Sequence, residues 1–285
     1  MNEFRQALDL VHDALGTLQA EGLTLHASRA ALERLAGVPR VERTQKTART
    51  ERTATPGAPA APAAAPGPAA PPVEIPATGP RAERLAALRG PVLACTLCPQ
   101  LVKSRTQVVF GVGNPEAELM FIGEAPGEDE DLQGEPFVGK AGQLLTKIIE
   151  TMGLSRDAVF IANVLKCRPD MPPGMPGNRK PKASEMETCK PYLLQQIEII
   201  QPRALVALGA VAMEGLLGET APMARLRGRW HDFRGTPLMA TYHPAYLLRN
   251  QSLGEKRKVW EDMLLVMEKL ALPISEKQRN FFLRA

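Results

Sequence analysis

The sequence lacks the marks of several common protein classes. No run of about eighteen apolar residues occurs in it, so no membrane-spanning helix is predicted. Cysteine is scarce, and four residues in a chain of 285 are too few for a disulfide scaffold. The segment Met1–Leu10 mixes polar and apolar residues and does not resemble a signal peptide. We therefore expect a soluble cytoplasmic protein without membrane contacts, whose cysteines stay reduced.

The charge balance is weakly basic. Lys and Arg outnumber Asp and Glu by 35 to 31, which gives a net charge of +4. An excess this small favours polyanionic partners only weakly. The apolar fraction of 44% is enough for one substantial core, and we find no internal repeat.

A stretch rich in Ala, Pro and Gly divides the chain into unequal parts. It has no hydrophobic face to bury, which predicts a disordered linker, placed over residues 39–84, with polyproline II character. Before it, apolar residues at helical spacing predict a short helical segment over residues 1–38. This segment is either a weakly stable appendage or a docking module for a protein partner. After the linker we expect a folded domain over residues 85–272 and a tail over 273–285.

Beyond the linker, short apolar runs alternate with longer amphipathic runs, which predicts an α/β domain. The alternation favours a three-layer α/β/α sandwich with a central, mainly parallel, four-stranded sheet. The expected strands are Leu119–Ile122, Val159–Ala162, Ala204–Leu208 and Leu238–Thr241. The expected helices are Gly139–Met152, Ser184–Ile200, Ala210–Leu217 and Leu253–Leu270.

Polar residues follow three of these strands. The first strand runs into Gly123-Glu124-Ala125-Pro126-Gly127, the second into Asn163 and the fourth into His243. Each motif alone is better explained as a turn or a strand end than as a functional site. Ligands bind at the carboxyl ends of the strands in open α/β sheets, where these residues stand together. We therefore expect a carboxylate, an amide and an imidazole to meet in one crevice.

The four cysteines form one pair and two singles. Cys95 and Cys98 form a C-x-x-C pair, Cys167 follows the second strand, and Cys189 lies in the next helix. Zinc usually takes two such pairs or completes its ligand set with His, and no His is near these cysteines in sequence. Four thiolates in this arrangement suit a [4Fe-4S] cluster better. Buried cysteines without a ligand are the alternative.

Several motifs together resemble the family 4, iron-sulfur uracil-DNA glycosylases. They are GEAPGEDEDLQGEPFVGKAGQLL, NVLKCRP with a later NRKP, YHPAYLLR and the four cysteines, between about Leu93 and Leu270. An enzyme of this family flips uracil out of DNA and hydrolyses its N-glycosidic bond, which leaves an abasic site. The resemblance implies a monomeric base-excision repair enzyme acting on single- or double-stranded DNA, at the nucleoid of a bacterial or archaeal cell.

The resemblance also implies roles for individual residues. Glu124 is expected to orient the attacking water, His243 to stabilise charge on the departing base, and Glu130 to lie near the uracil C5 edge. Phe137 is expected to stack on the base, and Asn163 to read its edge. The other base-contacting positions are Gly123, Ala125 and Asn178. The cluster ligands are Cys95, Cys98, Cys167 and Cys189.

Basic and apolar residues near these motifs are candidates for DNA contacts. Phosphate contacts are expected from some of the nearby cations, the others being solvated. The cations are Arg179, Lys180, Lys182, Arg225, Arg227, Arg229, Arg234 and Arg249. Leu247 and Leu248 are candidates either for a wedge in the vacated base stack or for core packing. Glu128, Asp129 and Asp131 are expected on a solvated helix N-terminus.

One departure and two alternatives accompany the resemblance. The stretch DMPPGMPG between Cys167 and Asn178 indicates an insertion that lengthens the interval to the last cysteine. A related branch, which traps its product covalently, has Gln where Ala125 stands here. A non-catalytic DNA-binding or polymerase-associated iron-sulfur protein would keep the cysteines and arginines without needing the three strand-end side chains together.

Overall fold

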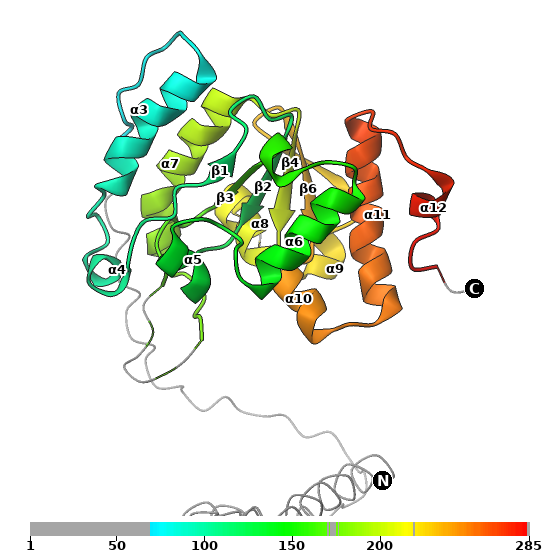
Figure 1. Ribbon diagram of the computed structural model, residues 1–285. Helices are drawn as coiled ribbons and strands as arrows, with labels where there is room; N and C mark the ends of the chain where they lie inside the picture. The colour runs from blue at the N-terminus through cyan, green and yellow to red at the C-terminus, as the bar shows by residue number, and fades with distance from the viewer. Residues whose placement is uncertain (1–68, 170, 172–174, 176, 219, 284–285) are drawn as a thin grey trace, which may run out of the picture. The chain divides into compact units, whose positions relative to one another are not determined.

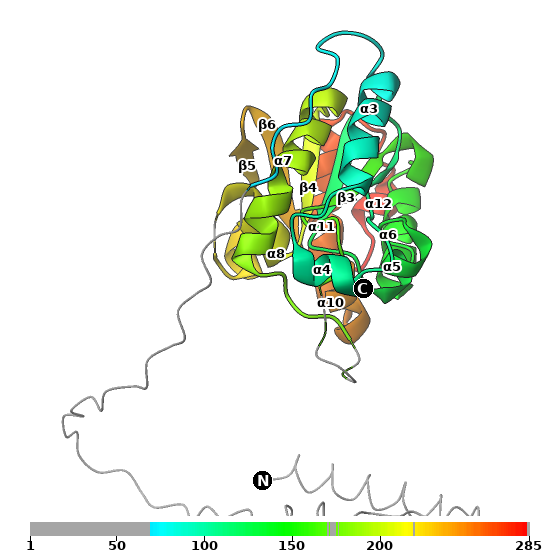
Figure 2. The same cartoon turned by 90° about the vertical axis from the view of Figure 1, so that its left-hand side faces the viewer.

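A central sheet lies between two layers of helices in the computed structural model, which describes residues 69–169, 171, 175, 177–218 and 220–283 (Figure 1). The predicted helices within residues 1–38 and the linker up to residue 68 lie outside the described residues. The three-layer α/β/α arrangement predicted from the sequence is confirmed. In Figure 2 the helices α7 and α8 lie to the left of β3 and β4, and α6 lies to their right.

The sheet has six strands in the described part of the chain, in the order β1-β3-β2-β4-β6-β5. The four inner strands are parallel and correspond to the predicted ones, whereas β1 and β5 add antiparallel edges. The predicted count of four strands was therefore too low. Both edge strands are short and only partly buried, so they carry no apolar run that the sequence would reveal. The strands are β1 Val112–Gly113, β2 Leu119–Gly123, β3 Phe160–Asn163, β4 Ala204–Leu208, β5 Trp230–Phe233 and β6 Thr236–Thr241.

The four predicted helices are α6, α7, α8 and α11, with ends within a few residues of the expected ones. The α-helices of the described part are α3 Arg81–Leu93, α4 Pro99–Ser104, α5 Glu128–Gln133, α6 Lys140–Thr151, α7 Ala183–Ile200, α8 Ala210–Leu217, α9 Met223–Leu226, α10 Pro244–Arg249, α11 Leu253–Lys269 and α12 Glu276–Arg279. None of these has the length and apolar character that crossing a bilayer requires.

Two hydrophobic cores form because side chains alternate between the two faces of each strand. In β2, Met120 and Ile122 pack into the core beneath α3, α7 and α8. Leu119 and Phe121 pack into the other core, beneath α6 and α11. The last residues of β2 and β3, Gly123 and Asn163, still follow this alternation and lie on the side of Phe121 and Ile161.

The ordered fold extends beyond the predicted limits at both ends. Ala70, in the expected linker, is buried, and its N–H donates to the carbonyl of Thr188 on α7 over 2.9 Å. At the other end, Trp260 Nε1 donates to the carbonyl of Gln278 over 2.6 Å, and Gln278 Nε2 donates to Thr151 O over 2.7 Å. Extended and short helical segments can thus pack on the domain through backbone hydrogen bonds, which composition alone does not reveal.

Candidate functional site

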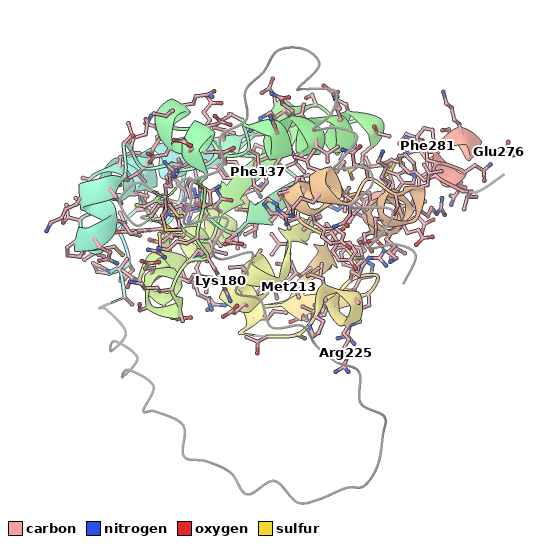
Figure 3. All side chains as sticks on the ribbon, turned by 90° about the horizontal axis from the view of Figure 1, so that it is seen from below. Phe137, Lys180, Met213, Arg225, Glu276 and Phe281 are labelled. Carbon is pink, nitrogen blue, oxygen red and sulfur yellow. The ribbon has the colours of Figure 1, made fainter. Side chains whose placement is uncertain are left out.

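A small cavity opens at the carboxyl ends of the parallel strands. This end of the sheet lies at the bottom of Figure 1, where α5 and α10 begin just after β2 and β6 end. The cavity has a volume of about 130 Å³, room for a few water molecules or one single-ring base. Figure 3 looks at this end of the molecule, with Phe137 near the middle. Predicted site residues in the cavity wall are Ala125, Glu130, Phe137, Asn163, Asn178 and His243.

The cavity floor depends on a glycine at the end of β2. Gly123 pairs with Asn163 at the end of β3. A Cβ atom at Gly123 would lie 2.4 Å from Asn163 Oδ1 and 2.5 Å from the ring of Phe137. No larger residue fits there, so both side chains lie directly over the end of β2. The Phe137 ring centroid is 5.5 Å from that of His243, which completes one continuous wall.

Asn163 carries an unsatisfied acceptor in this wall. The residue is 2% exposed, and its Oδ1 atom is buried without a hydrogen-bond partner in the described part of the chain. A buried acceptor without a donor costs about 1–3 kcal/mol, so native structures rarely leave one. The arrangement therefore favours a ligand that brings an N–H or O–H group to this atom.

His243 caps the N-terminus of α10 in a fixed orientation. Its Nδ1 accepts a hydrogen bond from the Ala245 N–H over 3.1 Å. Burial, with a smaller contribution from Arg249, lowers the pKa of the ring to about 4. The ring is therefore neutral at pH 7, and because Nδ1 accepts, the proton is assigned to Nε2. The cavity thus contains a neutral hydrogen-bond donor.

Behind His243, a buried ion pair holds the strand end. Thr241 Oγ1 donates to Asp262 Oδ2 over 2.7 Å, and Arg227 donates to both oxygens of the same carboxylate. Asp262 is fully buried, and the Arg227 side chain is 14% exposed. Arg227 also lies over the ring of Tyr242. Arg227 was expected among the phosphate-contacting or solvated cations, and its guanidinium is instead the partner of a buried carboxylate.

Glu130 holds the loop that carries Phe137. Its Oε2 accepts from the Gly127 N–H, and its Oε1 accepts from the N–H groups of Val138 and Gly139, each over 3.0 Å. The carboxylate therefore ties the turn after β2 to the start of α6. Its neighbour Asp131 was expected to be solvated and is instead 2% exposed, where it accepts from the Thr106 N–H.

Glu124 lies beside the cavity and not in its wall. The described residues of the wall include Ala125 but not Glu124. Glu124 comes after the last residue of β2, near Glu214 on α8, and α8 packs on the face of the sheet that holds Ile122. Burial raises the pKa of the Glu124 carboxyl, the nearby Lys180 lowers it, and Glu214 on α8 raises it. The predicted meeting of three side chains is thus found for Asn163 and His243, with Glu124 at the edge.

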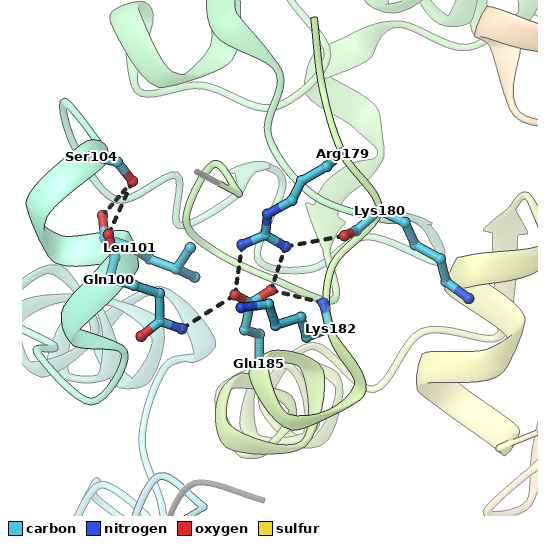
Figure 4. A network of polar contacts seen from close by, with 7 residues as sticks. All are labelled: Gln100, Leu101, Ser104, Arg179, Lys180, Lys182 and Glu185. Carbon is cyan, nitrogen blue, oxygen red and sulfur yellow. Dashed lines mark hydrogen bonds and ion pairs between the residues drawn. The ribbon is translucent and has the colours of Figure 1, made fainter. Parts of the chain in front are cut away.

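Asn178 reaches the cavity from a loop that is fixed by its neighbour. Arg179 donates to both oxygens of Glu185 on α7, over 2.9 and 2.7 Å (Figure 4). Glu185 is 1% exposed and also accepts from Gln100 on α4 and from the Lys182 N–H. Arg179 was expected among the DNA-contacting or solvated cations. It belongs instead to a network that joins the cavity loop to α4 and α7.

The four cysteines lie close enough to influence one another's charge. Cys167 and Cys189 are buried, and Cys95 and Cys98 are half-buried. Burial, followed by the charges of Cys167 and Cys95, raises the pKa of Cys98 to about 11. Burial likewise raises the pKa of Cys189 to about 12, with Cys167 and Cys95 adding to the effect. As free thiols in this environment they resist ionisation.

Two positively charged side chains adjoin the cysteines. Arg105 donates from its two amino groups to Cys167 Sγ over 3.0 Å and to the Cys95 carbonyl over 2.7 Å. The Lys166 backbone N–H donates to Cys189 Sγ over 3.3 Å. Burial lowers the pKa of the Lys166 ammonium to about 8, opposed by Cys189 and Cys167. Donors directed at sulfur favour thiolates, which are the form that binds metal.

Four cysteine thiols are available here as ligands for a metal group. No group of three or more His, Cys, Asp or Glu side chains around one ion position is found in the described residues. In an iron-sulfur cube each cysteine binds a different iron, so the four sulfurs need not converge on one point. The four sulfurs, their burial and the adjoining donors are consistent with such a group.

The sequence did not reveal the importance of Lys166, Glu185 or Gly142. The two charged residues are buried, and their neighbours in sequence give no sign of that burial. Gly142 lies in the first turn of α6, where a Cβ would be 1.8 Å from the Phe137 carbonyl oxygen. The sequence feature that could have identified Gly142 is a glycine inside a predicted helix, because such a glycine often marks a close backbone contact.

Comparison with known proteins places the chain in a family. The model of the uracil DNA glycosylase superfamily matches residues 110–264. The chain belongs to this superfamily.

A type-4 uracil-DNA glycosylase of Thermotoga maritima is 45% identical over 174 residues, which cover 60% of this chain and 87% of that protein. A type-4 uracil-DNA glycosylase of Sulfurisphaera tokodaii is 40% identical over 210 residues, or 70% of this chain and 91% of that protein. A type-5 uracil-DNA glycosylase of Thermus thermophilus is 29% identical over 62% of this chain and 94% of its own length. The family 4 resemblance is thereby confirmed.

We predict that Gly142→Ala destabilises this superfamily member by about 1–3 kcal/mol, because the added methyl group overlaps the Phe137 carbonyl and forces the backbone apart. Chemical denaturation would measure the loss. The matched control is Gly90→Ala in α3, where nothing lies within 4 Å of the new Cβ. That variant is expected to be equally stable or more stable by about 0.5–1 kcal/mol. Equal behaviour of the two variants would contradict the close contact.

We also predict that His243 stays neutral in the folded protein down to about pH 4. An unfolded His takes up a proton near pH 6.5, and the folded one does not. The contribution of His243 to stability is therefore present above about pH 6.5 and is lost as the pH falls from there towards 4. An NMR titration, with the His243→Asn spectrum used for assignment, measures the ring directly. A midpoint near the unperturbed value would refute the prediction.

Proposed function

We infer that the protein is a uracil-DNA glycosylase of base-excision repair, which hydrolyses the N-glycosidic bond of uracil in DNA and leaves an abasic site. The observation that carries this inference is the buried, unpartnered Oδ1 of Asn163 in a cavity of single-base size beside Phe137 and His243. The similarity to proteins named type-4 uracil-DNA glycosylase supports the same activity.

Asn163 is proposed to read the base after it is flipped from the stack. Its Oδ1 would accept from the uracil N3–H, and its amide N–H would donate to O4. Cytosine presents an acceptor at N3 and a donor at N4, so both contacts would fail, with buried polar groups left unpaired. The ring of Phe137 is proposed to stack on the pyrimidine, and its left-handed φ of 55° is maintained by the packing against Gly142.

His243 is proposed to stabilise the leaving group. When the bond between the sugar C1′ and uracil N1 breaks, its electron pair stays with the base, and negative charge spreads to O2. The Nε2–H of a neutral, fixed imidazole can donate to that oxygen without first losing solvent. The Ala245 N–H keeps the ring in the required tautomer.

Glu124 is proposed to act at the edge of the cavity, where the sugar would lie. It would orient the water that adds to C1′, accept its proton, and offset positive charge on the sugar. The raised pKa that burial gives this carboxyl makes it a better proton acceptor. Gly123, Ala125 and Asn178 are proposed to line the base. Glu130 is proposed as a positioning residue, since its oxygens hold the Phe137 loop.

We propose that DNA, as a single or double strand, binds across the end of the sheet at which the cavity opens. The protein is proposed to act as a monomer in the cytoplasm. Arg249 is the best phosphate contact, because it is exposed at the last residue of α10 and acts electrostatically on His243. Arg234 lies in the turn before β6, at the end of the sheet opposite to the cavity, and is therefore a poorer candidate for a phosphate contact. Leu248 is 38% exposed and is the better wedge candidate, whereas Leu247 is buried in the fold.

Cys95, Cys98, Cys167 and Cys189 are proposed to hold a [4Fe-4S] cluster. When bound, the cluster supplies covalent cross-links between three chain segments that are distant in sequence. Thiolate ligation couples such a site to folding. Hydrolysis of a glycosidic bond transfers no electron, so the proposed role of these cysteines is structural.

The proposed cluster predicts a brown protein that contains iron and acid-labile sulfide in equal amounts. Cys167→Ala is expected to lose the colour and to unfold at a lower temperature, because it removes a buried ligand that joins the β3 loop to the others. Visible absorption, iron and sulfide analysis and thermal melting measure these effects. A colourless wild type with bound zinc would reject the iron-sulfur assignment.

The test of the activity is excision from a uracil-containing oligonucleotide, followed by alkali to cleave abasic sites. We expect cleavage at uracil and none at cytosine or thymine. Asn163→Asp is expected to lower kcat/KM at least about tenfold, since the carboxylate cannot donate to O4. Asn114→Asp is the matched control, because its Oδ1 accepts from the Glu116 N–H in a turn far from the cavity and Asp can do the same.

Two outcomes would overturn the proposal in different ways. A wild type that makes no alkali-labile sites would favour the non-catalytic binding protein. A heat- and SDS-resistant adduct with the oligonucleotide would favour the branch that traps its product.

A further inference from the structure

A buried ammonium lies between the base cavity and the cysteines. Lys166 is 1% exposed, and its Nζ donates to the carbonyl of Asn163 over 2.9 Å and to Gln196 Oε1 over 2.5 Å. Its backbone N–H donates to Cys189 Sγ, and the next residue in the chain is Cys167. One side chain thus contacts the residue proposed to read uracil and stands beside two proposed cluster ligands.

This ammonium has no carboxylate partner in the described part of the chain. The buried carboxylates there are used elsewhere: Glu185 pairs with Arg179, Asp262 pairs with Arg227, and Asp131 accepts from a backbone N–H. The two acceptors of Lys166 Nζ are neutral oxygens. A charge buried among neutral groups is strongly destabilising, so an opposite charge is expected nearby.

The cysteines are the groups that can supply this opposite charge. Cys189 Sγ accepts a hydrogen bond from the Lys166 backbone N–H over 3.3 Å, and Cys167 is the next residue in the chain. Neutral thiols provide no compensation, whereas four thiolates around an iron-sulfur core carry a net negative charge. Arg105, in a half-buried position, donates to Cys167 Sγ over 3.0 Å. Two cationic residues therefore adjoin the proposed cluster ligands.

We propose that Lys166 is the internal counter-charge of the cysteine-bound cluster and, through the same ammonium, the positioning residue that fixes Asn163 for base recognition. This inference rests on the cluster and on the role of Asn163 proposed above. The hydrogen bond from Nζ holds the carbonyl of Asn163 at the point where β3 ends. Since Asn163 Oδ1 and the Phe137 ring both lie directly over Gly123, a fixed Asn163 backbone keeps Oδ1 in this position.

The ammonium therefore connects cluster binding to base recognition. A cation near an iron-sulfur cluster favours the more negative, reduced form and raises the reduction potential. Removing the cation should shift the potential to a more negative value. Removing the hydrogen bond should loosen Asn163 and weaken substrate binding. Two variants separate these effects.

Lys166→Met removes both the charge and the hydrogen bond while keeping a long unbranched side chain. We expect its cluster potential, measured by protein-film voltammetry, to be more negative than that of the wild type. We also expect the KM for a uracil-containing oligonucleotide to rise about tenfold, with kcat within about threefold. The exposed Lys103→Met in α4 is the matched control, and neither quantity should change there.

Gln196→Glu places a carboxylate where the amide oxygen accepts from Lys166, so it neutralises the charge and leaves the Nζ bond to Asn163 in place. It also removes the hydrogen bond from Gln196 Nε2 to the Phe110 carbonyl, which lowers stability without changing the bond to Asn163. We expect the potential to fall as in Lys166→Met, with the KM unchanged. If Lys166→Met fails to fold, Gln196→Glu alone tests whether Lys166 is the counter-charge of the cluster. An unchanged reduction potential in Gln196→Glu would overturn that role.

The outcomes distinguish a failure of this inference from a failure of the proposed cluster or of the proposed role of Asn163. A folded, iron-loaded Lys166→Met with the potential and KM of the wild type would reject both roles of Lys166. A changed potential with an unchanged KM would reject the positioning of Asn163. A wild type without iron would reject the cluster itself, which is a different failure.

Discussion

The packing of Asn163 and Phe137 over Gly123 is the contact on which the cavity depends. Gly123, Asn163 and His243 all continue the same side of their strands, the side of Phe121, Ile161 and Met239 in the core beneath α6 and α11. A two-residue period therefore brings together residues that are distant in sequence. The missing side chain of Gly123 leaves the space that the amide and the aromatic ring occupy.

Buried charges hold the loops around this cavity. Asp262 with Arg227 fixes the end of β6, and Glu185 with Arg179 fixes the loop that carries Asn178. Removing such charges from water costs several kcal/mol for each ion, so these pairs add less stability than their geometry suggests. What they provide is one arrangement of the cavity wall, because each guanidinium and carboxylate pair forms several directional bonds.

Local apolar periods predicted the parallel strands and the long helices, and the rule that parallel strands end together predicted that Asn163 and His243 meet. The resemblance to a known family supplied Glu130, Phe137 and Asn178. The sequence did not predict the edge strands, since two-residue or half-exposed strands lack an apolar run. It also misjudged Arg227, Arg179 and Asp131, which look like surface charges in sequence. Burial of a charge depends on tertiary neighbours, and one sequence does not contain that information in local form.

The separation of Glu124 from the cavity wall has a chemical consequence under the proposed roles. A base-reading amide and a charge-stabilising imidazole must touch the base, whereas a group that orients water must reach the sugar, on the other side of the glycosidic bond. Asn163 at the end of β3 and His243 just after β6 line the cavity, whereas Glu124 follows β2 and lies beside it. In the proposed mechanism this division would keep the carboxylate away from the developing negative charge on the base, which it would otherwise repel.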